Sequence, residues 1–281
     1  MQDHSLAQRA VKPLLVAALA AAIALPFSAR AEQAALPLTA RAGQAAPRCD
    51  VPLDLVRLSH PLSHIAQKLT TGEPIIIVAI GSSSTAGAFA SSPAASYPSR
   101  LAVELKQHFP KQSITVFNRG ANGEEVGDML RRFDASVIDA KPDLVLWQLG
   151  TNSVIREHTS FNYGAAIHEG LKKIRSVGAD VVLIDPQFVP KVIAKKEDAT
   201  NMVALISTMA KRENVDVFRR FDVMRRWSEV DHLAFETFVA PDGLHLNDWS
   251  YACMAKGLGM AISEAAKRPV VSATAAQHLV P

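Results

Sequence analysis

Runs of apolar residues alternate with amphipathic stretches along most of this 281-residue chain. The first run, Pro74 to Ile80 (PIIIVAI), has no polar interruption, which is typical of a strand buried on both faces of a sheet. Four further apolar runs predict four more strands: Ile114 to Phe117, Asp143 to Leu149, Asp180 to Ile184 and Val215 to Phe218.

Between these runs, apolar residues recur at the spacing of amphipathic helices. Strands that alternate with helices indicate a parallel sheet with right-handed crossovers, so we expect a three-layer α/β/α domain around a five-stranded sheet. We place this domain at residues 49–266, after a flexible leader at 32–48 and before a flexible tail at 267–281. The predicted helices are 97–109, 124–140, 165–177, 198–213 and 249–266, and residues 229–241 are expected to be irregular and to form part of a cleft wall.

Composition narrows the class of protein. Hydrophobic residues make up 48% and charged residues 20% of the chain, which suits one sizeable core and excludes a disordered polyelectrolyte. The formal net charge is only +3, so charge gives no reason to expect nucleic acid or an anionic membrane as a partner.

The N-terminus has the pattern of a signal peptide. Arg9 and Lys12 precede an apolar stretch from Leu14 to Leu25, and Ala29-Arg30-Ala31 supplies the small residues of a cleavage site. We therefore expect residues 1–31 to be removed after Ala31 and the mature protein to be periplasmic or secreted. The alternative is an uncleaved anchor, although the stretch is short for a membrane span.

The chain has two cysteines, Cys49 and Cys253. In an oxidising compartment an even pair favours a disulfide, which here would tie the mature N-terminus to the last predicted helix. An unstrained bridge across so long a loop stabilises the fold by about 3–5 kcal/mol. Two buried free thiols are the alternative.

Parallel sheets bind ligands beyond the carboxyl ends of their strands, so the residues that follow each apolar run are candidates for function. Residues 81–87 (GSSSTAG) place three hydroxyls between two glycines. Glycines allow a sharp turn, and a helix that starts there offers free N–H groups to a developing oxyanion. The segment lacks the patterns of a P-loop and of a dinucleotide loop, which leaves a nucleophile or a plain helix cap.

Further segments follow the later strands. Residues 118–123 (NRGANG) and 150–152 (GTN) supply two glycines and an asparagine amide, and Gln187 is a candidate substrate contact after the fourth strand. In residues 242–247 (DGLHLN), Asp242 precedes His245 by three positions, so its carboxylate can fix the imidazole that takes a proton from a serine. Taken alone, residues 118–123 favour an ordinary turn and residues 150–152 are a weak signal, while residues 242–247 are equally consistent with a helix-capping loop.

Taken together, the order and placement of these segments resemble the SGNH hydrolase superfamily, also called the GDSL esterases and lipases. The resemblance covers residues of about 74–262 and extends to a bacterial exported subgroup with GSSSTAG, NRG, WQLGTN and DGLHLND signatures. It implies a flavodoxin-like fold. The family's first block reads GDSxTxG, and alignment on Gly81, Thr85 and Gly87 assigns the nucleophile to Ser83.

The resemblance implies roles for the other segments too. His245 is the general base and Asp242 its partner, while the Ser83 N–H, the Gly120 N–H and the Asn152 side chain form the oxyanion hole. Ser82 stands where the family has the aspartate of GDS, which casts doubt on the geometry of the turn. Ser82 or Ser84 remains possible as the nucleophile.

These residues predict an exported serine esterase that needs no metal or cofactor and hydrolyses O-acyl esters through an acyl-enzyme. The small, polar first block and the absence of a long apolar lid favour a small acyl group, such as acetyl, on a cell-envelope or other carbohydrate. The alternatives are a lysophospholipase or thioesterase, a glycan O-acyltransferase, and a non-catalytic glycan-binding module.

Overall fold

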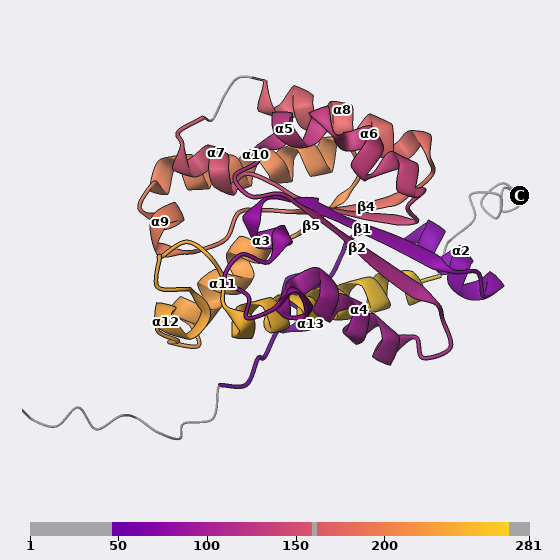
Figure 1. Ribbon diagram of the computed structural model, residues 1–281, viewed down its shortest axis with the longest axis horizontal. Helices are drawn as coiled ribbons and strands as arrows, with labels where there is room; N and C mark the ends of the chain where they lie inside the picture. The colour runs from indigo at the N-terminus through magenta and orange to yellow at the C-terminus, as the bar shows by residue number, and fades with distance from the viewer. Residues whose placement is uncertain (1–46, 159–161, 270–281) are drawn as a thin grey trace, which may run out of the picture. The chain divides into compact units, whose positions relative to one another are not determined.

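A computed structural model of the protein describes residues 47–158 and 162–269 (Figure 1). The predicted signal peptide at 1–31, nearly all of the leader at 32–48 and residues 270–281 of the predicted tail lie outside the described residues.

Five parallel strands form a single sheet in the order β2-β1-β3-β4-β5. The chain starts at an inner strand and adds strands outward in both directions, as flavodoxin-like sheets do. The predicted α/β fold with a five-stranded parallel sheet is therefore confirmed. The strands are β1 (Ile75–Gly81), β2 (Ile114–Gly120), β3 (Leu144–Gln148), β4 (Asp180–Ile184) and β5 (Asp216–Phe218).

Helices follow or precede every strand. They are α1 (Leu53–Val56), α2 (Ser63–Thr71), α3 (Ser83–Ala86), η1 (Pro93–Ala95), α4 (Tyr97–His108), α5 (Val126–Arg131), α6 (Phe133–Ser136), η2 (Ile138–Ala140), α7 (Thr151–Ile155), α8 (Tyr163–Ser176), α9 (Pro190–Ile193), α10 (Lys196–Arg212), α11 (Arg220–Glu229), α12 (Phe235–Phe238) and α13 (Asp248–Lys267), with η1 and η2 being 3-10 turns.

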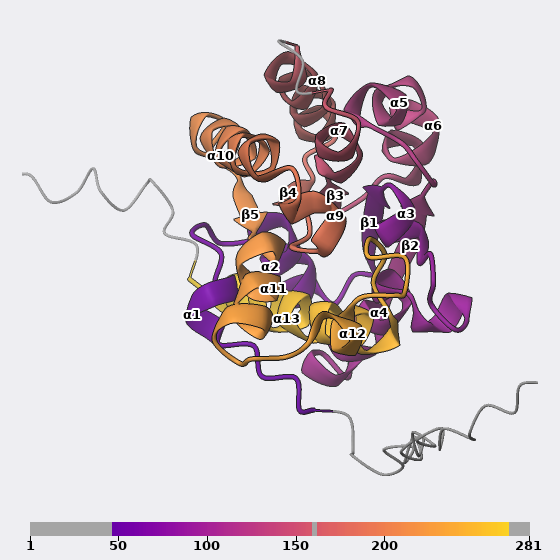
Figure 2. The same ribbon diagram turned by 90° about the vertical axis from the view of Figure 1, so that its left-hand side faces the viewer.

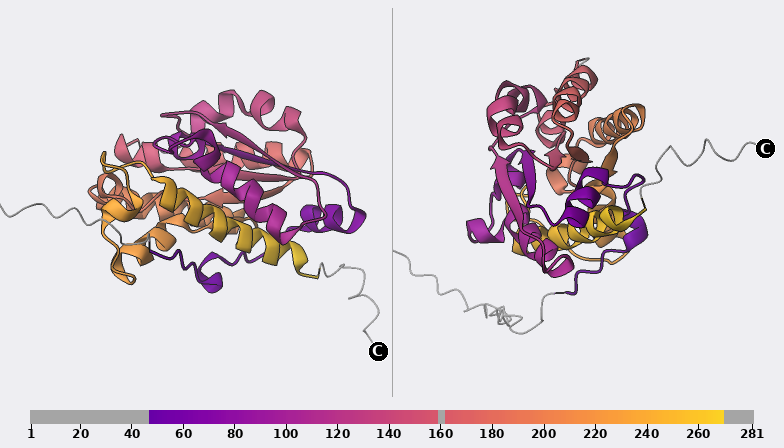
Figure 3. Two further views of the ribbon diagram at one scale, coloured as in Figure 1. Left: turned by 60° about the horizontal axis from the view of Figure 1, so that its bottom comes forward. Right: turned by 90° about the vertical axis from the view of Figure 1, so that its right-hand side faces the viewer.

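The helices make two layers, one on each face of the sheet. Figure 2 shows α5, α6, α8 and α10 along one face, and α2, α4, α11 and α13 along the other. The closing helix α13, drawn in yellow, runs beside α4, as Figure 3 shows. The short helices α3, α7, α9 and α12 gather at the left of Figure 1, where the strands have their carboxyl ends.

The core explains why the inner strands are apolar throughout. Every residue of β3 is buried, and in β1 only one of seven is not fully so. Trp147 of β3 packs edge-on against Phe133, with 5.1 Å between ring centroids. On α8, a Cβ added at Gly170 would lie 2.2 Å from the Trp147 ring, so the absence of a side chain lets α8 approach the sheet.

The structure differs from the sequence-based prediction in three places. The helix expected at 124–140 is broken into α5, α6 and η2 around Arg132, whose side chain reaches back to the turn after β2. Helices α2 and α11 were not expected: Ile65 is the one buried residue of α2, and α11 begins with a buried arginine ahead of its buried apolar residues Val223, Met224 and Trp227. The irregular segment at 229–241 contains the short helix α12.

The predicted disulfide between Cys49 and Cys253 is present, with 5.5 Å between the Cα atoms. It joins the start of the described chain to α13 across 204 residues of sequence. Within residues 47–158 and 162–269, none of the helices combines the length and apolar character that crossing a membrane requires.

Candidate active site

The structure brings three of the predicted residues into one chain of contacts. Ser83 Oγ lies 3.0 Å from His245 Nε2, and His245 Nδ1 lies 2.5 Å from Asp242 Oδ2. Ser83 is the first residue of α3, directly beyond β1, and the other two precede α13. Residues 162 positions apart in sequence therefore meet at the carboxyl edge of the sheet.

The loop that carries His245 is shaped by Asp242. One carboxylate oxygen of Asp242 accepts the backbone N–H groups of Leu244 and His245, each at 3.0 Å, and the other faces the imidazole. Burial opposes ionisation of Asp242, but these hydrogen bonds outweigh it and lower the pKa of Asp242 below its usual range. Gly243 between them has a φ of 69°, which glycine adopts without strain.

The three serines of the first block point in different directions. Ser82 and Ser84 are buried and bound to other side chains, whereas Ser83 is half-buried and faces His245. The Ser83 N–H occupies the first position of α3, where an intrahelical acceptor does not exist. It is thus available to an oxygen atom in front of the serine.

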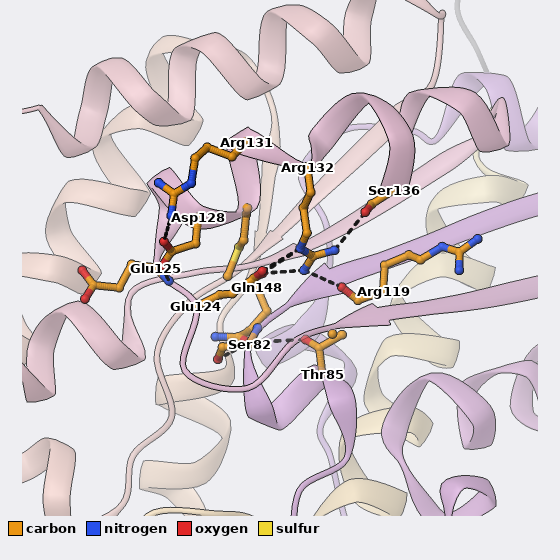
Figure 4. Close-up of polar contacts among 12 residues, drawn as sticks. Ser82, Thr85, Arg119, Glu124, Glu125, Asp128, Arg131, Arg132, Ser136 and Gln148 are labelled. Atoms are coloured by element: carbon orange, nitrogen blue, oxygen red, sulfur yellow. Dashed lines mark hydrogen bonds and ion pairs between the residues drawn. The ribbon is translucent and has the colours of Figure 1, made fainter.

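Ser82, in place of the family's aspartate, braces the turn through Gln148 (Figure 4). The backbone N–H and the hydroxyl of Ser82 both donate to Gln148 Oε1, at 2.8 and 3.0 Å, and Thr85 Oγ1 donates to the same oxygen at 3.3 Å. A Cβ at Gly81 would lie 2.2 Å from Thr85 Oγ1. The turn before Ser83 is therefore tightly packed and hydrogen-bonded without a carboxylate.

Gly120, the last residue of β2, packs directly on α3. A Cβ at this position would lie 2.0 Å from the Ala86 nitrogen. The Gly120 N–H donates to Asn118 Oδ1 at 2.9 Å, so in this structure it is already engaged. The structure thus brings Gly120 to α3 but gives its N–H a partner of its own.

Asn152, the second residue of α7, is tied to the turn after β2. One hydrogen of its amide goes to the Glu124 carbonyl, at 2.8 Å, which leaves the second for a ligand. The same turn is held by Arg132, which contacts the Glu124 carboxylate and donates to the Arg119 carbonyl at 2.8 Å (Figure 4). The amide of Asn152 is therefore fixed by a braced loop.

Arg220, at the start of α11, connects two loops of the site from beneath. Its fully buried guanidinium donates to Ser84 Oγ at 2.9 Å and to Thr151 Oγ1 at 3.3 Å. Ser84 follows Ser83, and Thr151 precedes Asn152. One side chain thus fixes the spacing between the serine turn and the asparagine helix.

Arg220 also donates from Nε to the backbone carbonyl of Asp185, at 2.9 Å. Burial lowers the pKa of Arg220 to about 10, so it remains charged at neutral pH. Burial raises the pKa of Asp185 to about 7. One oxygen of Asp185 accepts the Phe221 N–H, and the other has no hydrogen-bond partner among the described residues.

Gln187 does not lie where a substrate contact was expected. Its side chain is 1% exposed and donates to the Leu244 carbonyl at 2.7 Å. Sequence position correctly placed it at the carboxyl edge of the sheet, but the direction of its side chain depends on packing. In this structure Gln187 holds the loop of Asp242 and His245 from behind.

The sequence-based interpretation missed Gln148, Arg220 and Phe89, an exposed ring stacked on His245. The first two follow directly from the rule that residues at the carboxyl ends of strands build the site, applied to β3 and β5. Nothing in the sequence distinguishes Phe89 from a core aromatic.

Solved structures share this fold. A two-domain esterase (CEX) active on acetylated mannans is 16% identical, with a TM-score of 0.65, and the match covers 80% of this chain and 59% of that one. This chain therefore spans about three fifths of that esterase. A catalytic mutant of the acetylxylan esterase Axe2 from Geobacillus stearothermophilus is 18% identical, with a TM-score of 0.59 and coverage of 67% and 94%.

A third structure, from Desulfitobacterium hafniense DCB-2 and assigned to the G-D-S-L family, is 22% identical, with a TM-score of 0.56 and coverage of 66% and 98%. No curated protein matches this chain in sequence. Residues 48–268 match the non-GDSL lipase-like family, which is nearly the whole described chain. Because this match spans residues 48–268, the protein belongs to the non-GDSL lipase-like family.

Proposed function

We propose that the protein is an exported serine esterase that removes O-acyl groups, preferentially acetyl, from carbohydrate. The observation that carries the proposal is the continuous contact from Ser83 Oγ through His245 to Asp242, at 3.0 and 2.5 Å. Serine, imidazole and carboxylate in this order form the arrangement that makes a serine hydroxyl nucleophilic.

In the proposed mechanism, Ser83 Oγ attacks the ester carbonyl while His245 Nε2 takes its proton. Asp242 keeps the Nδ1 proton facing its carboxylate and stabilises the imidazolium that forms. His245 then gives the proton to the leaving alcohol oxygen. Water, deprotonated by His245, cleaves the acyl-enzyme and releases the acid.

The oxyanion of the tetrahedral intermediate requires donors in front of Ser83. The Ser83 N–H and the second amide hydrogen of Asn152 suit this role. For Gly120 to contribute, its N–H must leave Asn118 Oδ1.

The preference for an acetylated carbohydrate draws support from two sources. Two solved structures of similar fold are esterases described as active on acetylated mannans and as an acetylxylan esterase. The first block is small and polar, and the buried hydroxyls of Ser82 and Ser84 are hydrogen-bonded to Gln148 and Arg220, so this block offers little apolar surface to a fatty chain. Export draws support from the disulfide, because such bonds persist in oxidising compartments.

Hydrolysis of a panel of O-acetylated glycans and p-nitrophenyl acetate, octanoate and palmitate tests the proposal. We expect activity on the acetyl esters and its loss in Ser83→Ala, whereas Ser82→Ala, which removes one of three hydrogen bonds to Gln148 Oε1, should lower the activity without abolishing it. Full activity of Ser83→Ala would contradict the assignment of the nucleophile. A preference for palmitate would indicate a lipase, and transfer of acetyl to an added glycan would indicate an acyltransferase.

A further inference from the structure

Phe89 is an exposed aromatic residue held in an unfavourable backbone conformation. Its side chain is 56% exposed, although large apolar side chains are mostly buried in this fold. Its φ is 63°, in the left-handed region that a bulky residue rarely adopts. Such conformations persist where the surrounding structure enforces them, and they concentrate at functional sites.

The neighbours of Phe89 are anchored to α13 on both sides. The Tyr251 hydroxyl donates to the Ala88 carbonyl at 2.7 Å, and the Ser91 N–H donates to Asp248 Oδ1 at 2.8 Å. The helix that follows the His245 loop thus also fixes the position of Phe89. The exposed ring is a positioned group and not the tip of a free loop.

One face of the Phe89 ring lies on the His245 imidazole, with 5.2 Å between centroids and 16° between the planes. Phe89 also lines a cavity of about 370 Å³, within the size range of ligand sites, which borders the His245 loop through Gly243. Its wall is mostly apolar and includes Phe235, Val239 and Pro241. Glu236 lines it too, with an exposed carboxylate that makes no ion pair among the described residues.

The position of this cavity decides which part of a substrate reaches it. The oxyanion donors lie on α3, α7 and the turn after β2, so the carbonyl oxygen points toward those loops. His245 must reach the leaving oxygen to protonate it, at hydrogen-bond distance from Nε2. The alcohol half of the ester therefore extends along the side of His245 where Phe89 and residues 235–243 lie.

We propose that Phe89 and this cavity form a subsite for the sugar ring of the leaving alcohol, an inference that rests on the proposed esterase function. The C–H groups on one face of a pyranose carry partial positive charge and suit the negative face of an aromatic ring. The Glu236 carboxylate accepts hydrogen bonds from sugar hydroxyls at the rim. A fatty acyl chain has no hydroxyl group that could donate a hydrogen bond to that carboxylate.

The test separates the alcohol half of the ester from the acyl half. kcat/KM is measured for three esters. A mono-O-acetylated xylopyranoside and ethyl acetate have the same acyl group, and ethyl octanoate has the same small alcohol as ethyl acetate. In Phe89→Ala we expect the ratio of sugar ester to ethyl acetate to fall at least tenfold, and Phe89→Trp should retain the ratio. The matched control is Val103→Ala, which truncates another exposed apolar side chain, 59% exposed on α4.

An unchanged ratio in Phe89→Ala would overturn the proposal, because Phe89 would then act only through His245. A loss of kcat/KM confined to ethyl octanoate would also overturn it, because the cavity would then bind the acyl chain. Binding of xylo-oligosaccharide to Ser83→Ala, with and without Phe89→Ala, tests the subsite without hydrolysis. Weaker binding on loss of the ring supports the subsite even if the esterase assignment fails, and equal binding refutes it.

Discussion

Replacing the buried arginine beneath the site, as Arg220→Met, is expected to weaken both the fold and the catalysis. Methionine fills much of the same space but has no donors. The change removes hydrogen bonds to the Asp185 carbonyl, to Ser84 Oγ and to Thr151 Oγ1. All three acceptors belong to buried residues, so water cannot freely replace the guanidinium.

The magnitude follows from these three acceptors. A hydrogen bond from a charged group contributes about 1.5–3 kcal/mol, and a buried acceptor left without a partner costs about 1–3 kcal/mol. The longest of the three hydrogen bonds, at 3.3 Å, contributes least. Removing the buried charge also removes the free-energy cost of its desolvation, which offsets part of the loss. We therefore expect the free energy of unfolding to fall by about 3–5 kcal/mol, which lowers Tm by roughly 6–20 °C in a domain of this size.

Urea unfolding and esterase kinetics measure the two effects. We expect kcat to drop on the order of 10²-fold, because a shift of about 1 Å between the serine turn and the asparagine helix is that costly. The control is Arg225→Met on the same helix. Arg225 is half exposed and pairs with Asp222 one turn away, so its loss should change stability by less than about 1 kcal/mol.

Equal stability of Arg220→Met and Arg225→Met would refute this reasoning, since the buried hydrogen bonds would then contribute nothing. A destabilised variant that kept full kcat at low temperature would refute the positioning role alone. Arg220→Lys should recover part of the stability but little of the activity, because one ammonium cannot reach both hydroxyls in the geometry of a guanidinium.

Three further predictions concern other parts of the molecule. Burial raises the pKa of Asp185 to about 7 in the native state, so the native protein binds this proton more tightly than the unfolded chain does. The free energy of unfolding should therefore fall as pH rises from about 4 to 7, and urea unfolding of Asp185→Asn across this range should not show that fall. Cys253→Ser should lower the unfolding free energy by about 3–5 kcal/mol, and a reductant should destabilise wild type but not this variant. Asn152→Ala should reduce kcat about 10²–10³-fold with little change in Tm, and a loss below tenfold in steady-state assays would remove Asn152 from the oxyanion hole.

Much of the fold was predictable because its strands are buried on both faces. The apolar runs from Pro74 to Ile80 and from Asp180 to Ile184 match β1 and β4 to within a residue. Helix α11 was missed because its first buried side chain is Arg220, and charged residues normally mark a solvent face. The helix at 124–140 breaks because Arg132 is drawn to the turn after β2, a contact 13 residues back along the chain.

The site was predictable where the chemistry resides in short motifs. The spacing of Asp242 and His245 already permits their contact, and the loop has the expected form. The role of Gln187 was not predictable. The sequence places Gln187 after β4, but packing of the core turns its side chain toward the Leu244 carbonyl.

Local periodicity and residue type were enough to predict the parallel sheet, the pairing of the two cysteines and the polar segments at the strand ends. Three features became visible only in the folded protein: which of the three serines contacts His245, how Gln148 braces a turn without the family's aspartate, and the exposed position of Phe89 beside the imidazole. Each of these depends on side-chain direction, which is set by residues distant in the chain and brought close by packing of the core.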